Sequence, residues 1–498
     1  MTTTKPDKQE GGISKIVRNA SYMMGSQLAT WAMTLTTIFL IPRYLGAEAF
    51  GEFSSAESIW LIGGAVTLFG LDTLLTKSIA REPEKVSSYF STAIVNVVFN
   101  YTLTFGGILL FAWLSGYSPL RIQLIAMVGI GSFAMSILNL AQSCLTGLEQ
   151  MGYVSSVATI NRAIFTVLAL TALFMGGNLF AIVIVTIAVS ILGAIFMVGA
   201  LYKAHPFKLI YDYNLSKQLF IDGSPYFLTL IFAKLYKEFD MVMMTSLLPD
   251  AAELGYYSVA DRLFGTLMFL PNALITALFP VLARMHSEES DLLPNYISKS
   301  FNILFLIGVP VGLGISAISG PIILLLFGEG YTDAAKILQI LGFVLILTYQ
   351  TILLGNFLIS VDKQRAWTIT MAVAAFATIP LDLVLVPYAQ TFGPAGVGGA
   401  LAYIFTEGGM VIAGLYLLPR GYINWGNAVF VIKAALAGGV MYAAVLFMNQ
   451  YGLVPAVAAG AIVYPATIWL LRTIPDEDMT LIKSMAAPIT NKLGRFKK

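Results

Sequence analysis

The fold is decided by the stretch Pro225-Tyr-Phe-Leu-Thr-Leu-Ile-Phe-Ala-Lys-Leu-Tyr-Lys-Glu-Phe-Asp-Met-Val-Met-Met-Thr-Ser-Leu-Leu248, an apolar run that is interrupted near its middle. The interrupting side chains are Lys234, Lys237, Glu238 and Asp240. If the stretch crosses a bilayer, these groups lie close to the midplane, where a lone charge costs at least about 2.5 to 3.5 kcal/mol. They must therefore face protein or water and not lipid.

The spacing of the four groups predicts two pairs on one helix face. Lys234 lies one turn before Glu238, and Lys237 lies three residues before Asp240, so each cation can meet an anion. Two interpretations stay open. The pairs can serve only to make a membrane helix tolerable, or they can form the charged wall of a transport cavity.

The composition identifies a polytopic membrane protein. Of the 498 residues, 57% are hydrophobic and 11% are charged, whereas soluble domains contain about 25% charged residues. The single cysteine, Cys144, excludes an internal disulfide and a cysteine metal cluster. His205 and His286 are isolated in polar loops, so we expect no metal site.

Apolar runs of about 20 residues, the length that a bilayer requires, recur along the whole chain. We expect an all-α protein with about 14 transmembrane helices. The expected runs cover approximately residues 20–41, 53–76, 89–113, 122–144, 153–175, 179–202, 225–248, 256–282, 296–318, 334–359, 367–386, 397–418, 425–448 and 453–471. The first run is expected to be a retained helix and not a cleaved signal peptide.

These spans divide into two lobes of six helices followed by two extra helices. The expected domains are a cytoplasmic N-terminal tail (1–14), an N-terminal lobe (15–202), a cytoplasmic linker (203–217), a C-terminal lobe (218–418), helices 13 and 14 (419–472) and a cytoplasmic basic tail (473–498).

The distribution of Lys and Arg predicts the orientation, since these residues collect in cytoplasmic loops. With the N-terminus inside, Arg43, Arg121 and Lys336 alone fall outside, and Lys234, Lys237 and Arg262 lie within spans. The rest of the 29 Lys and Arg, Arg162 among them, are assigned to the inner side. Both termini are therefore expected in the cytoplasm.

The connections argue against an enzyme. The longest polar stretches, 203–217 and 282–295, are too short to hold a soluble catalytic domain. No glycine-rich phosphate-binding loop is present in the sequence. We expect no catalytic residues, no cofactor and no nucleic-acid partner.

An internal repeat relates the two lobes. At a constant shift of 204 residues, Tyr44–Ala56 aligns with Leu248–Ala260, and the identities are Ala47 with Ala251, Gly51 with Gly255, Ser54 with Ser258 and Ala56 with Ala260. Glu57 then meets Asp261. Six spans separate the copies, so both lobes run in the same direction. A pseudo-twofold axis along the membrane normal follows, with a substrate path between the lobes.

Two segments carry a resemblance to a known family. They are Gly255-Tyr-Tyr-Ser-Val-Ala260, preceded by Asp240, and Gly320-Pro-Ile-Ile-Leu-Leu-Leu-Phe-Gly-Glu-Gly-Tyr331. Both resemble the polysaccharide transporter (Wzx-like flippase) branch of the multidrug/oligosaccharidyl-lipid/polysaccharide exporter superfamily. The resemblance implies two six-helix lobes, two extra helices and a flippase for oligosaccharides linked to a polyprenyl pyrophosphate, working by alternating access.

On this resemblance we expect a substrate site that contains Lys234, Lys237, Arg262 and Arg18. The lysines would attract the pyrophosphate.

Coupling or gating by H⁺ or Na⁺ is expected at acids within the spans, which are Glu57, Asp72, Glu238, Asp240 and Asp261. Asp382 and Glu407 extend this acidic set, and for all of these acids a role in helix packing or pairing stays open.

The alternatives are a cation-coupled drug or toxin antiporter of the same superfamily, a membrane-embedded glycosyltransferase or ligase, and a scaffold. A glycosyltransferase would be expected to show a large outer loop, and a scaffold would leave the midplane charges unexplained. The expected location is the cytoplasmic (inner) membrane. The expected partners are a lipid-linked oligosaccharide, membrane lipid, and the polymerase and glycosyltransferases of the same pathway.

Overall fold

The computed structural model describes residues 30–248 and 250–474, and this part of the chain is helical with no strand. Residues 30–45 form the first described helix. The remaining helices are α2 (Ala47–Leu68), α3 (Leu71–Arg81), α4 (Val86–Leu114), α5 (Pro119–Gly147), α6 (Met151–Phe174), α7 (Leu179–Ala204), α8 (Tyr213–Leu247), α9 (Ala251–Leu267), α10 (Phe269–Ser287), α11 (Leu293–Ala317), α12 (Ser319–Phe327), α13 (Ala334–Ser360), α14 (Gln364–Ala389), α15 (Gly396–Leu417), α16 (Trp425–Asn449) and α17 (Leu453–Leu470), with short 3-10 turns at Pro83–Lys85 and Glu329–Tyr331.

The all-helical polytopic fold is confirmed. Twelve segments of the described chain are long and apolar enough to cross a membrane. The two further predicted spans are the first run, of which the structure describes only residues 30–45, and α8. The 35 residues of α8 are long enough to cross, but its central charges make it too polar to count by composition.

Two spans that the sequence predicts as continuous are broken in the structure. The second span divides into α2 and α3 at Phe69 and Gly70, whose φ angles of 51° and 73° are left-handed and end the first segment. The eighth span divides into α9 and α10 at Met268. Pro271 has no N–H to bond the Leu267 carbonyl, and the Tyr349 hydroxyl donates to that carbonyl instead at 2.9 Å.

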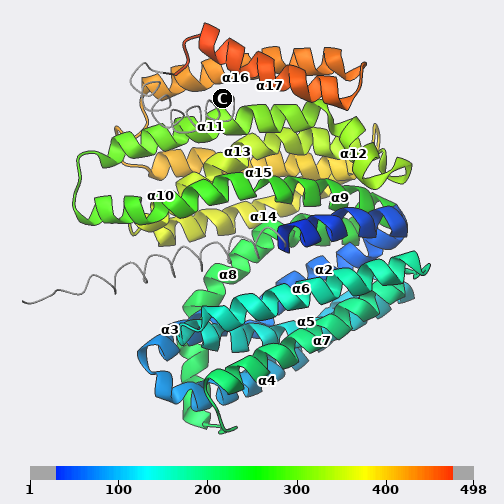
Figure 1. Ribbon diagram of the computed structural model, residues 1–498, viewed down its shortest axis with the longest axis vertical. Helices are drawn as coiled ribbons and strands as arrows, with labels where there is room; N and C mark the ends of the chain where they lie inside the picture. The colour runs from blue at the N-terminus through cyan, green and yellow to red at the C-terminus, as the bar shows by residue number, and fades with distance from the viewer. Residues whose placement is uncertain (1–29, 249, 475–498) are drawn as a thin grey trace, which may run out of the picture. The chain divides into compact units, whose positions relative to one another are not determined.

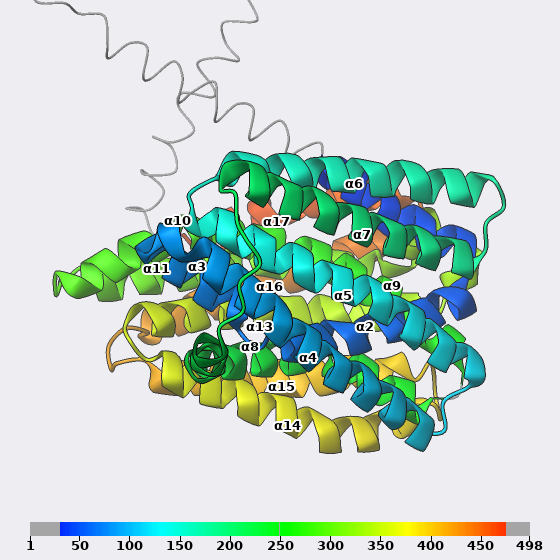
Figure 2. The same cartoon turned by 90° about the horizontal axis from the view of Figure 1, so that it is seen from below.

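The chain forms two compact units, which we describe one by one. The first contains the described residues up to Ser258 together with Leu326–Tyr331, and the second contains Val259–Leu325 and the residues from Thr332 onward. The boundary lies within α9. In the first unit α5 packs against α7, α2 and α4, and α8 packs against α2 (Figures 1 and 2). The predicted lobe boundaries stay predictions.

The second unit is built on α13, which packs against α11 and α15, while α16 and α17 form an adjacent pair (Figure 1). The α16–α17 pair packs on α11 through a core that includes Val309, Phe430 and Ala437. Many large apolar side chains of both units point outward, among them Leu103 and Ile462. Such a surface is expected for helices that face lipid.

The connection between α7 and α8 is shorter than the predicted linker, because α7 ends at Ala204 and α8 begins at Tyr213. Asp212 caps α8 by accepting from the amides of residues 214 and 215 at 2.8 and 3.1 Å. Polar side chains of α4 hold this connection, since the Ser91 hydroxyl donates to the Lys208 carbonyl at 3.0 Å and Ser216 donates to Asn96 at 2.6 Å. The base of α8 is therefore tied to α4.

Candidate functional site

The charged segment of α8, residues 234–240 in the second half of the helix, is partly buried and partly exposed. Glu238 and Asp240 are buried, Lys234 is half-buried, and the Lys237 side chain is 66% exposed. The Lys237 ammonium lies 3.9 Å from the Glu238 carboxylate. The Tyr257 hydroxyl donates to Asp240 at 3.2 Å. These contacts are not the predicted pairs of Lys234 with Glu238 and of Lys237 with Asp240, and those pairs stay predictions.

The sequence predicts a span that begins at Pro225. In the structure α8 begins earlier, at Tyr213, and Pro225 lies inside it. A proline in a helix leaves the carbonyl four residues earlier without its amide donor. Here that carbonyl belongs to Ile221, and the Ser224 hydroxyl donates to it at 2.8 Å. Membrane helices often tolerate proline through such hydroxyl donors, and the helix therefore continues through Pro225.

The break in the second span packs against this region of α8. A Cβ atom on Gly70 would lie 2.7 Å from the Gly223 carbonyl oxygen, and one on Gly223 would lie 2.9 Å from the Phe69 carbonyl oxygen. The rings of Phe69 and Phe227 stack with centroids 4.4 Å apart. Two glycines thus allow the break between α2 and α3 to contact the backbone of α8 beside its proline.

The repeated residues of the sequence meet each other at the start of α2 and α9. A Cβ atom on Gly51 would overlap the carbonyl of Ala251, and one on Gly255 would overlap the carbonyl of Ala47. The contact is reciprocal, as a twofold arrangement requires. Each alanine of one copy therefore packs on the glycine of the other, and we call these four residues the glycine seam.

A buried ion pair that the sequence analysis missed joins α2, α5 and α8. Arg121 donates from Nε and Nη2 to the two carboxylate oxygens of Glu52, at 2.8 and 3.1 Å. Its Nη1 donates to the Thr245 carbonyl of α8 at 3.1 Å, and its guanidinium lies 5.5 Å from the Tyr117 ring. Both charged residues are buried. This bidentate geometry fixes the end of α8 to the helices around it.

The charge distribution predicts Arg121 in an outer loop, and Glu52 stands in the sequence only as a member of the repeated segment. No local pattern pairs the two, because 69 residues separate them in sequence. The sequence signal that could have pointed to the pair is that Glu52 and Arg121 each directly precede an apolar run.

The other predicted acids of the first unit lie in α2 and α3. Glu57 is half-buried in α2. Asp72 lies in the first turn of α3, where its carboxylate accepts from the Thr73 amide at 2.8 Å. Lys77, five residues further, donates to the Tyr226 hydroxyl of α8 at 3.1 Å.

Two predicted residues, Asp261 and Arg262, are half-buried in the part of α9 that belongs to the second unit. The predicted symmetry of Asp261 with Glu57, and their gating role, relates residues of different units. Both stay predictions. Arg18 lies outside the described residues.

The second unit buries two carboxylates. Asp382 in α14 and Glu407 in α15 are 0% and 1% exposed. The Thr351 hydroxyl of α13 donates to Glu407.

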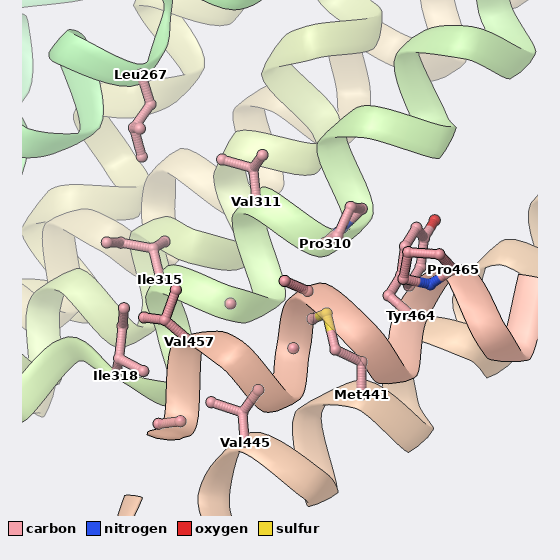
Figure 3. A pocket seen from close by; sticks show the side chains of 14 residues that line it. Leu267, Pro310, Val311, Ile315, Ile318, Met441, Val445, Val457, Tyr464 and Pro465 are labelled. Carbon is pink, nitrogen blue, oxygen red and sulfur yellow. The ribbon is translucent and has the colours of Figure 1, made fainter. Parts of the chain in front are cut away.

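An apolar cavity of about 450 Å³ lies between α11, α16 and α17. Figure 3 shows Met441 of α16 and Val457 of α17 facing it, together with Pro310 of α11. Pro310 leaves the Leu306 carbonyl without its helical donor, and the Tyr464 hydroxyl donates to that carbonyl at 3.1 Å. The lining is almost entirely apolar, so it suits an apolar chain and gives a sugar almost no hydrogen-bond partner.

Comparison with known proteins gives two family matches. The model of the family described as "Polysaccharide biosynthesis protein" matches residues 16–286, and the MatE model matches residues 225–384.

Among relatives, the Shigella flexneri protein named "Putative O-antigen transporter" is 24% identical over 345 residues, which are 66% of this chain and 80% of that protein. The Haemophilus influenzae protein named "Probable lipid II flippase MurJ" is 28% identical over 272 residues, which are 47% of this chain and 50% of that protein. The chain thus spans about half the length of the second relative.

A solved structure of lipid II flippase MurJ in an inward closed conformation has a TM-score of 0.70 at 14% identity, covering 91% of this chain and 99% of that chain. At this identity the likeness concerns the fold, which agrees with the two-lobe helical architecture expected from the sequence.

Proposed function

This chain belongs to the polysaccharide biosynthesis protein family, and on that premise we propose that it is a flippase for an oligosaccharide linked to a polyprenyl pyrophosphate. The observation that carries the proposal is the family match over residues 16–286, which includes the whole of α8. The relatives named as an O-antigen transporter and a lipid II flippase support the same substrate class. The substrate would cross the cytoplasmic membrane by alternating access.

In this proposal the cations of α8 attract the pyrophosphate. Lys237 supports the role because its side chain is 66% exposed although it lies near the middle of the apolar stretch 225–248. Lysine is a compact, strongly hydrated charge on a flexible stem, which suits a phosphate that must be released again. Lys234, Arg262 and Arg18 would add to the attraction.

The acids Glu57, Asp72, Glu238, Asp240 and Asp261 would couple or gate the cycle through H⁺ or Na⁺. Among them Asp240 and Glu238 are buried beside the proposed lysines. A change in their protonation would alter the charge that a substrate meets at α8.

The glycine seam would be one place where the cycle changes contacts. Its backbones touch without an intervening side chain, so the contact can be made and broken without moving buried rotamers.

The apolar cavity beside α16 and α17 would take a segment of an apolar chain, such as that of a polyprenyl carrier. Its volume of about 450 Å³ lies within the 300 to 1,000 Å³ that is usual for ligand pockets.

A cation-coupled antiporter is the second candidate. It is favoured by the MatE match over residues 225–384, which includes both Asp240 and Asp382. In that reading the acids bind the coupling cation and the transported compound is a drug or toxin.

We also propose that both termini are cytoplasmic and that the protein acts beside the polymerase and glycosyltransferases of its pathway. The excess of Lys and Arg on the inner side of the predicted topology supports the orientation. Labelling of a cysteine at position 210 by an impermeant reagent in intact cells, in a Cys144→Ser background, would overturn it.

Complementation tests the function. A bacterium that lacks its own O-antigen flippase should regain surface glycan when it expresses this chain, and its resistance to cationic drugs should stay unchanged. Raised drug resistance without surface glycan would favour the antiporter instead. A change of Lys237 to Ala serves as the matched control for a protein that inserts but does not transport.

A further inference from the structure

The start of α16 and the end of α17 bring together two cations that are distant in sequence. Lys433 lies in the third turn of α16, and Arg472 directly follows α17 and its cap. The Lys433 ammonium donates to the Arg472 carbonyl at 3.2 Å. Lys433 is half-buried and Arg472 is exposed. None of the ion pairs between described residues includes either cation.

The backbone of Arg472 has a conformation that favours glycine. Its φ angle of 46° is left-handed. Its amide donates to the Trp469 carbonyl and the Thr473 amide donates to the Ile468 carbonyl, both at 3.1 Å. This is the hydrogen-bond pattern of a helix end that glycine usually completes. Local backbone preference therefore does not account for an arginine at this position.

The two cations lie in a part of the chain that is free of acids. From residue 408 to residue 475 the sequence contains no Asp or Glu, and the next acids, at 476–478, lie outside the described residues. The helix α11, on which the α16–α17 pair packs, also contains no Asp or Glu. Lysine has three N–H donors, of which Lys433 uses one on a carbonyl, and the guanidinium of Arg472 has five. These donors suit an anion with several oxygens, such as a phosphate.

Two exposed tryptophans mark this end of the helix pair as the membrane surface. Trp425, the first residue of α16, is 78% exposed, and Trp469, near the end of α17, is 74% exposed. Tryptophan is enriched at the level of the lipid headgroups. The long side chain of Lys433 reaches back to the end of α17, as lysines near helix ends commonly do. Both cations are therefore available at the depth of lipid phosphates.

The apolar cavity lies along the same two helices (Figure 3). Met441, which lines it, is two turns beyond Lys433, about 12 Å along α16 and about 80° around the helix. On α17, Pro465 lines the cavity seven residues before Arg472. A molecule whose phosphate lies at the two cations can therefore place an apolar chain in the cavity.

We infer that Lys433 and Arg472 bind the phosphate of an anionic membrane phospholipid, one acyl chain of which lies in the apolar cavity. The inference goes beyond the proposed function and does not depend on it. A phospholipid fits because the cations are open at headgroup depth, whereas the pyrophosphate of the substrate is assigned to α8. The phospholipid would occupy the cavity while no carrier chain is bound.

The test measures binding of phosphatidylglycerol to the purified full-length protein in a neutral detergent. Phosphatidylcholine with the same acyl chains is the matched lipid of zero net charge. The wild type should bind phosphatidylglycerol at least about tenfold more tightly, because two cations near the membrane surface attract an anionic lipid. Added salt should reduce this preference.

Removing either cation should remove the preference. K433Q and R472Q should each weaken phosphatidylglycerol binding at least about tenfold, as the loss of hydrogen bonds to a charged group implies. K433R keeps the charge and should retain most of the binding. R365Q, which removes an exposed arginine near the start of α14, is the matched control and should leave the binding of both lipids unchanged.

R472G separates binding from a structural role. Glycine suits the left-handed backbone, so this variant should unfold at the same temperature as the wild type or a higher one. It should nevertheless lose phosphatidylglycerol binding as R472Q does. An R472G protein that unfolds at a lower temperature and binds phosphatidylglycerol as tightly as the wild type would show that Arg472 is structural, and the inference would be wrong.

Three further results would overturn the inference. The first is equal binding of the two lipids by the wild type. The second is a preference for phosphatidylglycerol that K433Q and R472G both keep. The third is a loss of geranylgeranyl pyrophosphate binding in these variants with unchanged phosphatidylglycerol binding, which would assign the cations to the substrate. Should K433Q fail to fold, R472G and R472Q carry the same comparison.

Discussion

Two arginines of the first unit, Arg121 and Arg162, are held by their neighbours in opposite ways. Arg121 is buried, pairs with both carboxylate oxygens of Glu52 and donates to a backbone carbonyl of α8. Arg162 is half-buried and is described in contact with a hydroxyl and an aromatic ring. The first arrangement gives each of the three guanidinium nitrogens a fixed acceptor and suits a brace.

This difference indicates which charged residues within membrane helices stabilise the fold and which are available to act on a substrate. A buried cation with a bidentate acid contributes to stability mainly through what its removal leaves behind, which is an uncompensated carboxylate. An exposed cation with a long contact to its acid, such as Lys237, adds little to stability through that pair and contributes to the field that a substrate meets. Stability and transport should therefore separate when each is changed.

The largest expected effect comes from removing Arg121. R121A leaves Glu52 buried without its partner and should lower the free energy of unfolding by about 3 to 5 kcal/mol. Denaturant unfolding of the purified protein in detergent measures it, and R81A at the exposed end of α3 is the matched control.

The paired change E52L with R121L should recover most of that loss, because it removes both charges. If R121A unfolds within about 0.5 kcal/mol of R81A, a range usual for surface substitutions, the Glu52 pair is not a brace and the comparison fails.

Lys237 should behave as a transport residue and not as a brace. Its contact with Glu238 is long, at 3.9 Å, and its side chain is 66% exposed, so the pair adds little to stability. K237A should reduce glycan export at least about tenfold, which corresponds to 1.4 kcal/mol, at an unchanged protein level. K237R should retain part of the activity.

The paired change K237A with D240A decides between the two interpretations of α8. If it restores both protein level and export, the lysine was structural, and the proposed substrate site is wrong.

The smallest expected effect concerns a neutral brace in the second unit. Y464F removes the hydroxyl that donates to the Leu306 carbonyl and should cost about 1 kcal/mol of unfolding free energy. In a P310A background the amide of residue 310 can bond that carbonyl again, so the same change should cost close to nothing. Equal costs in the two backgrounds would show that the bond to Leu306 has no part in stability.

Much of the fold follows from sequence because apolar length is a local property. The runs predicted at 89–113, 334–359 and 425–448 agree with α4, α13 and α16 to within a few residues. The breaks at Gly70 and Met268 were missed, since a left-handed residue or a proline three residues inside a helix barely alters hydropathy. At Pro225 the sequence predicts the start of a helix, but α8 continues through it, because the Ser224 hydroxyl donates to the carbonyl that the proline frees.

The site is predictable only where its residues are close in sequence. The cluster at the centre of α8 was visible as an interrupted apolar run, and the repeat pointed to the residues of the glycine seam. The Glu52–Arg121 pair needed the fold, because its members come from different helices. Arg162 could have been found as the lone charge between residues 151 and 202.

The central claim is that this chain moves a lipid-linked oligosaccharide across a bilayer, and reconstitution tests it most directly. Proteoliposomes that contain the purified protein and a polyprenyl-pyrophosphate-linked oligosaccharide would be treated with a lectin or glycosidase that cannot cross the membrane. We predict that nearly all of the glycan becomes accessible with the wild type, and about half with K237A or with empty liposomes, where only the outer leaflet is exposed. If the wild type exposes no more glycan than empty liposomes under any H⁺ or Na⁺ gradient, the claim is contradicted.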